Sequence, residues 1–227
     1  MFAQVKRLTE DRATIDEFVS DCDRWTTLWR ELDAKPADPA VFEQLVARYG
    51  EPWRAYHTLQ HVRACLHHLD EARHLLQRPA ELELALWFHD AINDTQRSDN
   101  EELSARWALQ HVLEQGLLAG VAARVHDLVL ATKHDAPPGE DEGTFLVDID
   151  LAILGQPAAA FALYETQIRQ EYSWVEEPAF CEGRARILEG FLQRDSIYHT
   201  DHFRERLEHQ ARRNLERSLS NLRAKPR

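Results

Sequence analysis

Apolar residues recur at steps of three and four along nearly the whole chain, which is the period of an amphipathic α-helix. An early example runs through Phe18, Cys22, Trp25, Leu28, Trp29 and Leu32. The strict alternation of apolar and polar residues that marks a half-buried strand is scarce. The pattern predicts helices over residues 13–33, 39–49, 56–77, 80–93, 99–115, 119–134, 144–154, 157–171, 178–193 and 199–222. The expected fold class is therefore all-α, a single bundle of about ten helices.

One segment, residues 135–143, lacks the helical period. It is polar and contains Pro137 and Pro138, so we expect a surface loop there. The chain of 227 residues has no Gly/Ser-rich linker, which favours one domain spanning residues 1–227. Within it we distinguish N-terminal helices (1–50), a core that carries the candidate site (51–155) and C-terminal helices (156–227).

Charge and composition narrow the classes of partner. A net charge of −12 argues against binding to a nucleic-acid polymer, because that affinity comes mainly from cations that neutralise phosphates. The first residues form no apolar signal segment and no apolar run is long enough to span a bilayer, so we expect a cytoplasmic protein without a membrane partner. The three cysteines lack metal-type spacing and are expected to be free thiols. A homo-oligomer is compatible with the sequence.

The most informative feature is the pair His89-Asp90 at the end of the apolar stretch 84–88. An ionised carboxylate among apolar residues costs several kcal/mol unless it is paired or bound to a metal. Other candidate ligands also lie in apolar-flanked helical segments, namely His57, His61, His134, and Asp148 or Asp150. A single histidine of this kind is usually a core residue, but the set together with the doublet indicates a metal site.

The donor types indicate which ion would bind. Two imidazoles and two carboxylates suit one divalent ion, with Mn²⁺, Fe²⁺, Co²⁺ or Ni²⁺ favoured and Mg²⁺ or Zn²⁺ acceptable. Adjacent helical residues point about 100° apart, so His89 and Asp90 can share an ion only if other helices complete its shell. His57 and an aspartate of segment 147–151 are the natural candidates. Asp148 and Asp150 are about 200° apart on a helix, so only one of them can readily bind the same ion.

This arrangement resembles the HD superfamily of metal-dependent phosphohydrolases, all-α proteins that use an H…HD…D ligand set. Further blocks are similar to those of a bacterial subgroup of predicted HD phosphohydrolases, and they lie at residues 56–62, 87–91, 99–105, 131–135, 148–155, 168–172 and 197–200. The resemblance covers most of the chain beyond the first helix.

The resemblance implies that His57, His89 and Asp90 are metal ligands. Family members often read Asp-x-Asp at the last ligand and use the second carboxylate, which implies Asp150. Asp148 would then lie beside the ion or the substrate.

Relatives with two metals carry further histidines, and this chain matches them only in part. His134 fits one such position, but Asn100 stands where a histidine would be expected. We therefore expect a single ion, with His134 contacting phosphate or moving a proton. The departure at Asn100 also disfavours the oxidative two-iron branch of the superfamily.

The expected activity is hydrolysis of a nucleotide or another small phosphorylated metabolite by a metal-activated water. Asp94, one turn beyond Asp90 on the predicted helix, or Glu101 would transfer protons together with His134. The expected substrate contacts are His61, Lys133, Arg169 and Asp148. The alternative is a regulatory module that binds a metal or nucleotide without turnover. The aromatic residues Trp25, Trp29, Trp87 and Phe88 are expected to be core.

Overall fold

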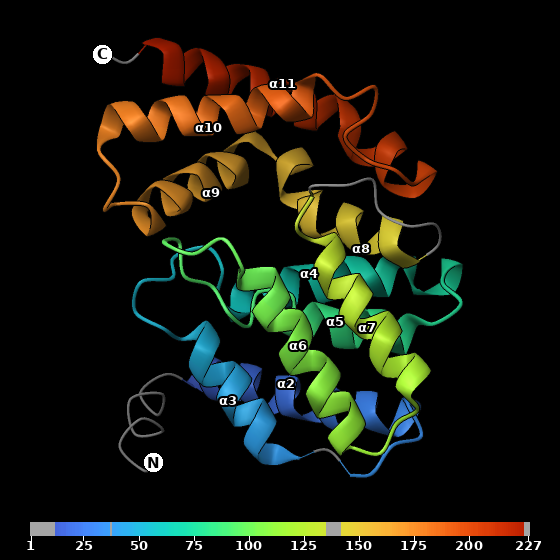
Figure 1. The fold of residues 1–227 in the computed structure, drawn as a ribbon. Coiled ribbons are helices and arrows are strands. Elements are labelled where there is room, and N and C mark those ends of the chain that lie inside the picture. The colour runs from blue at the N-terminus through green and yellow to red at the C-terminus, as the bar shows by residue number, and fades with distance from the viewer. Residues whose placement is uncertain (1–11, 37, 135–141, 225–227) are drawn as a thin grey trace.

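The computed structural model describes residues 12–36, 38–134 and 142–224 (Figure 1). The α-helices are α2 (Arg12–Glu31), α3 (Pro39–Tyr49), α4 (Leu59–Ala72), α5 (Pro79–Phe88), α6 (Asn100–Glu114), α7 (Ala119–Ala131), α8 (Glu142–Asp150), α9 (Ala158–Glu171), α10 (Glu177–Leu192) and α11 (Asp201–Ala224). Two 3₁₀ helices, η1 (Arg73–Leu75) and η2 (Leu151–Gly155), follow α4 and α8. No strand occurs in these ranges, so the predicted all-α bundle is confirmed.

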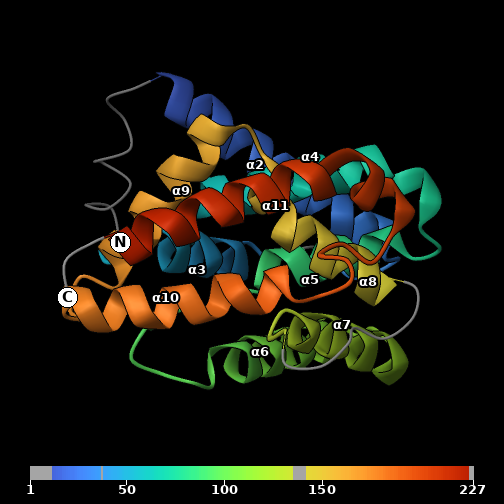
Figure 2. The ribbon, with the colours of Figure 1, turned by 90° about the horizontal axis from the view of Figure 1, so that it is seen from above.

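Helix α5 is the centre of the bundle. It contacts α2, α4, α6, α7 and α8, while α2 and α3 lie at one end of the molecule and α9, α10 and α11 at the other (Figure 1). Seen from above, α10 and α11 lie side by side across the top of the molecule (Figure 2). Its residues from Leu82 to Phe88 are all buried. A helix covered on every side needs no polar stripe, which explains the uninterrupted apolar run in the sequence. The doublet that follows α5 therefore emerges in the middle of the protein.

Aromatic side chains fill the core between α2, α3, α5 and α6. Trp25, Trp29 and Trp87 are at most 1% exposed, as predicted. Trp25 meets Trp87 edge to face with ring centroids 5.8 Å apart, and it stacks on His111 of α6 at 6.2 Å. Burial lowers the pKa of His111, which keeps this ring neutral in the core.

Among the helix ends that differ from the prediction, three move a candidate site residue. Helix α4 begins at Leu59 because the Thr58 hydroxyl caps it by accepting from the Gln60 N–H at 3.3 Å. Helix α5 ends at Phe88, and α7 ends at Ala131. His57, Asp90 and His134 consequently lie outside helices.

Residues 135–141 of the predicted loop lie outside the described residues. The loop was predicted to continue through Gly143, but α8 already begins at Glu142. The Glu142 carboxylate accepts from the backbone N–H groups of Gln77 and Arg78, at 3.0 and 2.8 Å. This tertiary contact fixes the start of α8.

Two expectations from composition can be compared with the described ranges. No single helix in them is both long and apolar enough to cross a membrane, whereas one pair bent by 103°, Glu142–Gly155 with Ala158–Glu171, meets those criteria of length and composition. Cys22, Cys65 and Cys181 are free thiols, as predicted.

Candidate metal centre

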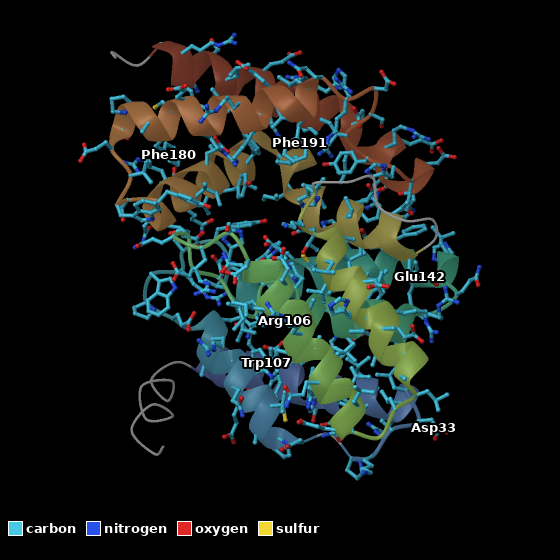
Figure 3. All side chains as sticks on the ribbon, in the orientation of Figure 1. Asp33, Arg106, Trp107, Glu142, Phe180 and Phe191 are labelled. Atoms are coloured by element: carbon cyan, nitrogen blue, oxygen red, sulfur yellow. The ribbon has the colours of Figure 1, made fainter. Side chains whose placement is uncertain are left out.

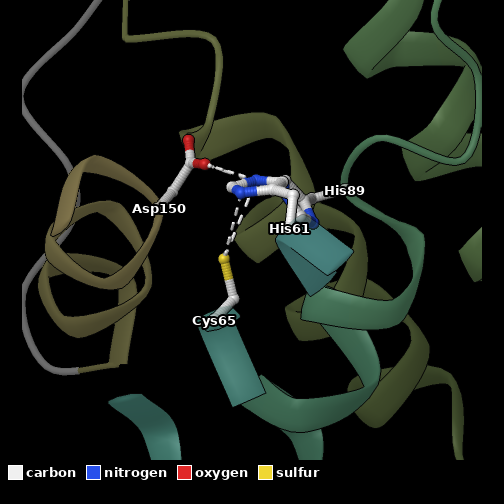
Figure 4. A group of neighbouring side chains, drawn as sticks. All are labelled: His61, Cys65, His89 and Asp150. Carbon is white, nitrogen blue, oxygen red and sulfur yellow. Dashed lines mark hydrogen bonds and ion pairs between the residues drawn. The ribbon is translucent and has the colours of Figure 1, made fainter. Parts of the chain in front are cut away.

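Four donor side chains from three parts of the fold converge beside the end of α5. His61 lies in the first turn of α4, His89 and Asp90 follow α5, and Asp150 is the last residue of α8. The Nε2 atoms of His61 and His89 are 3.0 Å apart (Figure 4). Asp150 Oδ1 is 3.2 Å from the first nitrogen and 3.6 Å from the second. Asp90 Oδ2 is 3.5 and 3.1 Å from the same two atoms.

These separations match the edges of a metal coordination shell. Donors bound at about 2.1 Å are about 3.0 Å apart at right angles and about 3.4 Å apart at the tetrahedral angle. The five separations in this group span 3.0 to 3.6 Å. The residues present therefore fit one divalent ion, which would neutralise the two carboxylates.

A backbone contact orients the His89 ring. Its Nδ1 lies 2.8 Å from the Leu86 carbonyl oxygen, which can only accept a hydrogen bond. Nδ1 must therefore carry a proton, so the neutral ring directs the lone pair of Nε2 at His61 and the two carboxylates. This is the tautomer that a metal ligand requires.

The charged side chains of this donor group strongly shift one another's pKa values. Burial alone would raise the pKa of Asp90, but the neighbouring His89 and His57 lower it. Burial likewise opposes the ionisation of Asp150, and hydrogen bonds from His134, His61 and His89 nevertheless bring its pKa well below the usual value. The two carboxylates raise the pKa of His89 well above normal despite its burial. The site thus favours a positive charge among the ligands.

The structure brings His61, rather than His57, into this group. The predicted helix over residues 56–77 would place both rings on one face, but His57 precedes the N-cap of α4, so the four-residue spacing does not align them. The ring centroids of His57 and His61 are 6.0 Å apart. His57 lies close enough to Asp90 for the two charges to shift each other's pKa.

Glu171, the last residue of α9, holds His57 in place. Its Oε1 accepts from the N–H groups of Ala55, Tyr56 and His57 at 2.7 to 3.0 Å, and its Oε2 lies 2.6 Å from His57 Nδ1. Burial opposes the charge, but bonds from His57 and the backbone lower the pKa of Glu171 to about 2. The carboxylate therefore stays ionised and fixes the loop before α4.

Arg54 joins this loop to the doublet. Its guanidinium is buried and donates to the carbonyl oxygens of His57, Asp90 and Ala91 at 3.1, 2.6 and 3.0 Å. Two of these bonds satisfy the Asp90 and Ala91 carbonyls, which follow the end of α5 and would have bonded within the helix had it continued. Arg54 therefore explains both the end of α5 and the position of Asp90.

His134 contacts a different carboxylate oxygen of Asp150 from the one that His61 and His89 face. Its Nε2 is 3.2 Å from Asp150 Oδ2, whereas His61 and His89 face Oδ1. Its backbone φ is +57°, a left-handed conformation that turns the chain at the end of α7. The ring of Phe191 on α10, which is labelled in Figure 3, packs against the His134 ring with centroids 6.4 Å apart.

The two predicted proton-transfer carboxylates lie in different surroundings. Because α5 ends early, Asp94 is not on a helix face with Asp90, and it is exposed in a turn where its Oδ1 accepts from the Gln96 N–H at 2.9 Å. Glu101, in the first turn of α6, is partly buried. Burial and the charge of Asp90 raise its pKa.

Three predicted substrate contacts are engaged elsewhere. Buried Asp148 accepts from the His199 and Thr200 N–H groups and from the Thr200 hydroxyl, which fixes the start of α11. The Arg169 guanidinium donates hydrogen bonds to the Tyr172 and Val175 carbonyl oxygens and to the Glu177 carboxylate, so it holds the turn after α9. Lys133 forms an ion pair of 2.7 Å with Glu102.

Sequence reasoning did not single out Glu171, Arg54 or Cys65 as parts of the site. Glu171 lies inside one of the family-like blocks, and Cys65 is one turn after His61, so both carried a usable signal. The Cys65 Sγ packs against the His61 ring, 3.7 and 3.8 Å from its nitrogens (Figure 4). The carbonyl contacts of Arg54 are tertiary and leave no pattern in the sequence.

Comparison of the chain with protein-family models, with curated proteins and with solved structures finds no match in any of the three. The geometry of this centre is therefore the basis for a functional proposal.

Proposed function

We propose that this protein is a metal-dependent phosphohydrolase that acts on a nucleotide or another small phosphorylated metabolite. The observation that carries the proposal is the convergence of His61, His89, Asp90 and Asp150 at the separations of a coordination shell. Such an ion acidifies its bound water and polarises a phosphoryl oxygen. The donor set suits Mn²⁺, Fe²⁺, Co²⁺ or Ni²⁺ best.

Glu101 is the proposed proton donor to the leaving oxygen. Burial and the nearby Asp90 raise its pKa, so a larger fraction of this carboxyl holds its proton than on an ordinary surface glutamate. A general acid with a raised pKa transfers that proton more effectively near neutral pH. Asp94 is a weaker candidate because its carboxylate caps an exposed turn.

His134 and Lys133 are the proposed contacts to the phosphate. His134 contacts Asp150 Oδ2, the carboxylate oxygen that does not face His61 and His89. Lys133 precedes His134 in the chain, just after the end of α7. The Lys133–Glu102 ion pair is partly exposed, and solvent screens exposed pairs, so a phosphate can displace the carboxylate.

The test combines metal content with phosphate release. Metal in protein purified without added ions is measured first, and phosphate release from a panel of nucleotides and phosphorylated metabolites is then followed with Mn²⁺. Asp90→Asn and His61→Gln should each abolish release and weaken metal binding. Asp99→Asn is the matched control, because this exposed carboxylate pairs only with Arg97 at the surface.

Two results would refute the proposal. One is failure of any divalent transition metal to bind or to raise the melting temperature. The other is phosphate release that persists in Asp90→Asn. Stable metal binding with no release from any substrate would instead indicate a binding module. His57→Gln distinguishes the two histidines, because it should retain metal binding if His61 is the ligand.

A further inference from the structure

A cavity of about 460 Å³ lies between the loop after α3, the turn at residues 94–96 and the chain after α9. Its lining includes Trp53, Asp94, Gln96, Gln170 and Trp174. This volume is within the range of small-molecule sites. The proposed metal ligands are not among its lining residues, so it is distinct from the metal centre.

Two half-exposed indole rings in this cavity are fixed in position. Trp53 and Trp174 are both 54% exposed. Trp53 Nε1 donates to the Asn93 carbonyl oxygen at 3.2 Å, and Trp174 Nε1 donates to the Thr95 hydroxyl at 2.8 Å. Trp174 also stacks on Tyr172, with ring centroids 6.5 Å apart. Large aromatic rings that are exposed yet held rigidly are typical of binding sites.

The charges of the lining indicate the class of ligand. Asp94 lies in the chain between Asn93 and Thr95, the residues that anchor the two indoles, and its side chain is exposed. Asp94 provides the exposed carboxylate of the cavity, because the carboxylate of Glu171, which also lines it, is buried against His57 and the loop before α4. The described lining contains no lysine or arginine. It therefore disfavours a phosphate or another anion, and two indole faces beside a carboxylate are what an organic cation requires.

We propose that this cavity is a binding site for a small organic cation, such as a quaternary ammonium or methylated amine, held between Trp53 and Trp174 with Asp94 as the counter-charge. The two π-faces attract the cation electrostatically, and the fixed rings lose little conformational entropy on binding. The site does not depend on the proposed phosphohydrolase activity.

The test is a calorimetric titration with choline, with 3,3-dimethylbutan-1-ol as the neutral molecule of the same shape. Choline should bind saturably and the neutral alcohol at least about fivefold more weakly, as expected for a cation–π site. Trp53→Leu and Trp174→Leu should each weaken choline binding about fivefold or more, and Asp94→Asn about threefold. EDTA in every sample removes any contribution of the metal centre.

Matched variants make the outcome decisive. Trp174→Phe preserves an aromatic face and should bind more tightly than Trp174→Leu, which separates the π contact from a loss of folding. Asp99→Asn removes a nearby exposed carboxylate that does not line the cavity and should leave binding unchanged. The proposal is overturned if choline does not saturate the site, if the neutral alcohol binds equally well, or if the leucine variants bind like wild type.

Discussion

The contact between Glu171 and the loop before α4 gives the sharpest prediction for stability. Its carboxylate accepts three backbone N–H groups and contacts His57 Nδ1, and the buried group has a pKa of about 2 where the ordinary value is 4.5. A shift of that size corresponds to about 3 kcal/mol of stabilisation from the charge. Glu171→Gln preserves the shape but removes the charge, so we expect it to lower the free energy of unfolding by about 3 kcal/mol near pH 6.

The pH dependence of this loss follows from the direction of the shift. The carboxyl titrates near 4.5 when unfolded and near 2 when folded, so its contribution is complete above pH 4.5 and is lost as the pH falls towards 2. The pKa of His57 is raised above 6.5, so the protonated ring contributes fully below pH 6.5 and less as the pH rises through its folded value. The difference between wild type and Glu171→Gln should therefore be greatest between about pH 5 and 6.5.

Urea unfolding of the metal-free protein in EDTA, followed by circular dichroism from pH 3 to 8, measures this difference. Glu182→Gln is the control. Glu182 is exposed, and its surface pair with Arg186, at 3.6 Å, is weak. This substitution should therefore change the free energy of unfolding by less than about 0.5 kcal/mol. If the loss in Glu171→Gln is equally small, or is the same at pH 3 and pH 6, the account of Glu171 is wrong.

Two further substitutions test packing and the position of the doublet. Gly155→Ala would place a methyl group 2.5 Å from Leu207 Cβ and 2.9 Å from the Leu207 carbonyl oxygen. Thermal unfolding should therefore show a loss of stability of about 1–3 kcal/mol. Gly183→Ala is the control, because its methyl group would meet nothing within 4 Å, and it should be neutral or stabilising. Arg54→Lys retains the charge but cannot bond all three carbonyls, so Asp90 should be displaced. Calorimetry should then show metal binding weakened about tenfold. An unchanged affinity would show that Arg54 does not position Asp90.

The helical period of the sequence predicted the fold well because most helices bury one continuous apolar face. Helix α3 was predicted at its observed bounds, since Asp38 caps it and Pro39 occupies its first position. The C-terminal end of α5 and the start of α4 were predicted wrongly. The end of α5 depends on the Arg54 guanidinium, and the start of α4 depends on the Thr58 cap and on the contact of the preceding loop with the distant Glu171.

The candidate site was predictable in its composition but less so in its geometry. The burial of the doublet and the rotation between Asp148 and Asp150 follow from helical periodicity, and the structure does place these two aspartates in separate contacts. The grouping of His61 with His89 could not be inferred, because it depends on where α4 begins. Periodicity cannot locate such a boundary within one turn.

The ends of three helices have a consequence for the order in which ligands bind. Helices α5, α7 and α8 all present their C-terminal ends close to the centre, through His89, His134 and Asp150. The end of α7 carries a partial negative charge of up to about half a unit, whereas the Arg54 guanidinium offsets that charge at the end of α5, and η2 continues directly from α8. The charge at the end of α7 adds to the two carboxylates and repels an anion. A phosphorylated substrate would therefore meet an unfavourable potential until the cation is bound, so we expect metal binding to precede substrate binding in the proposed reaction.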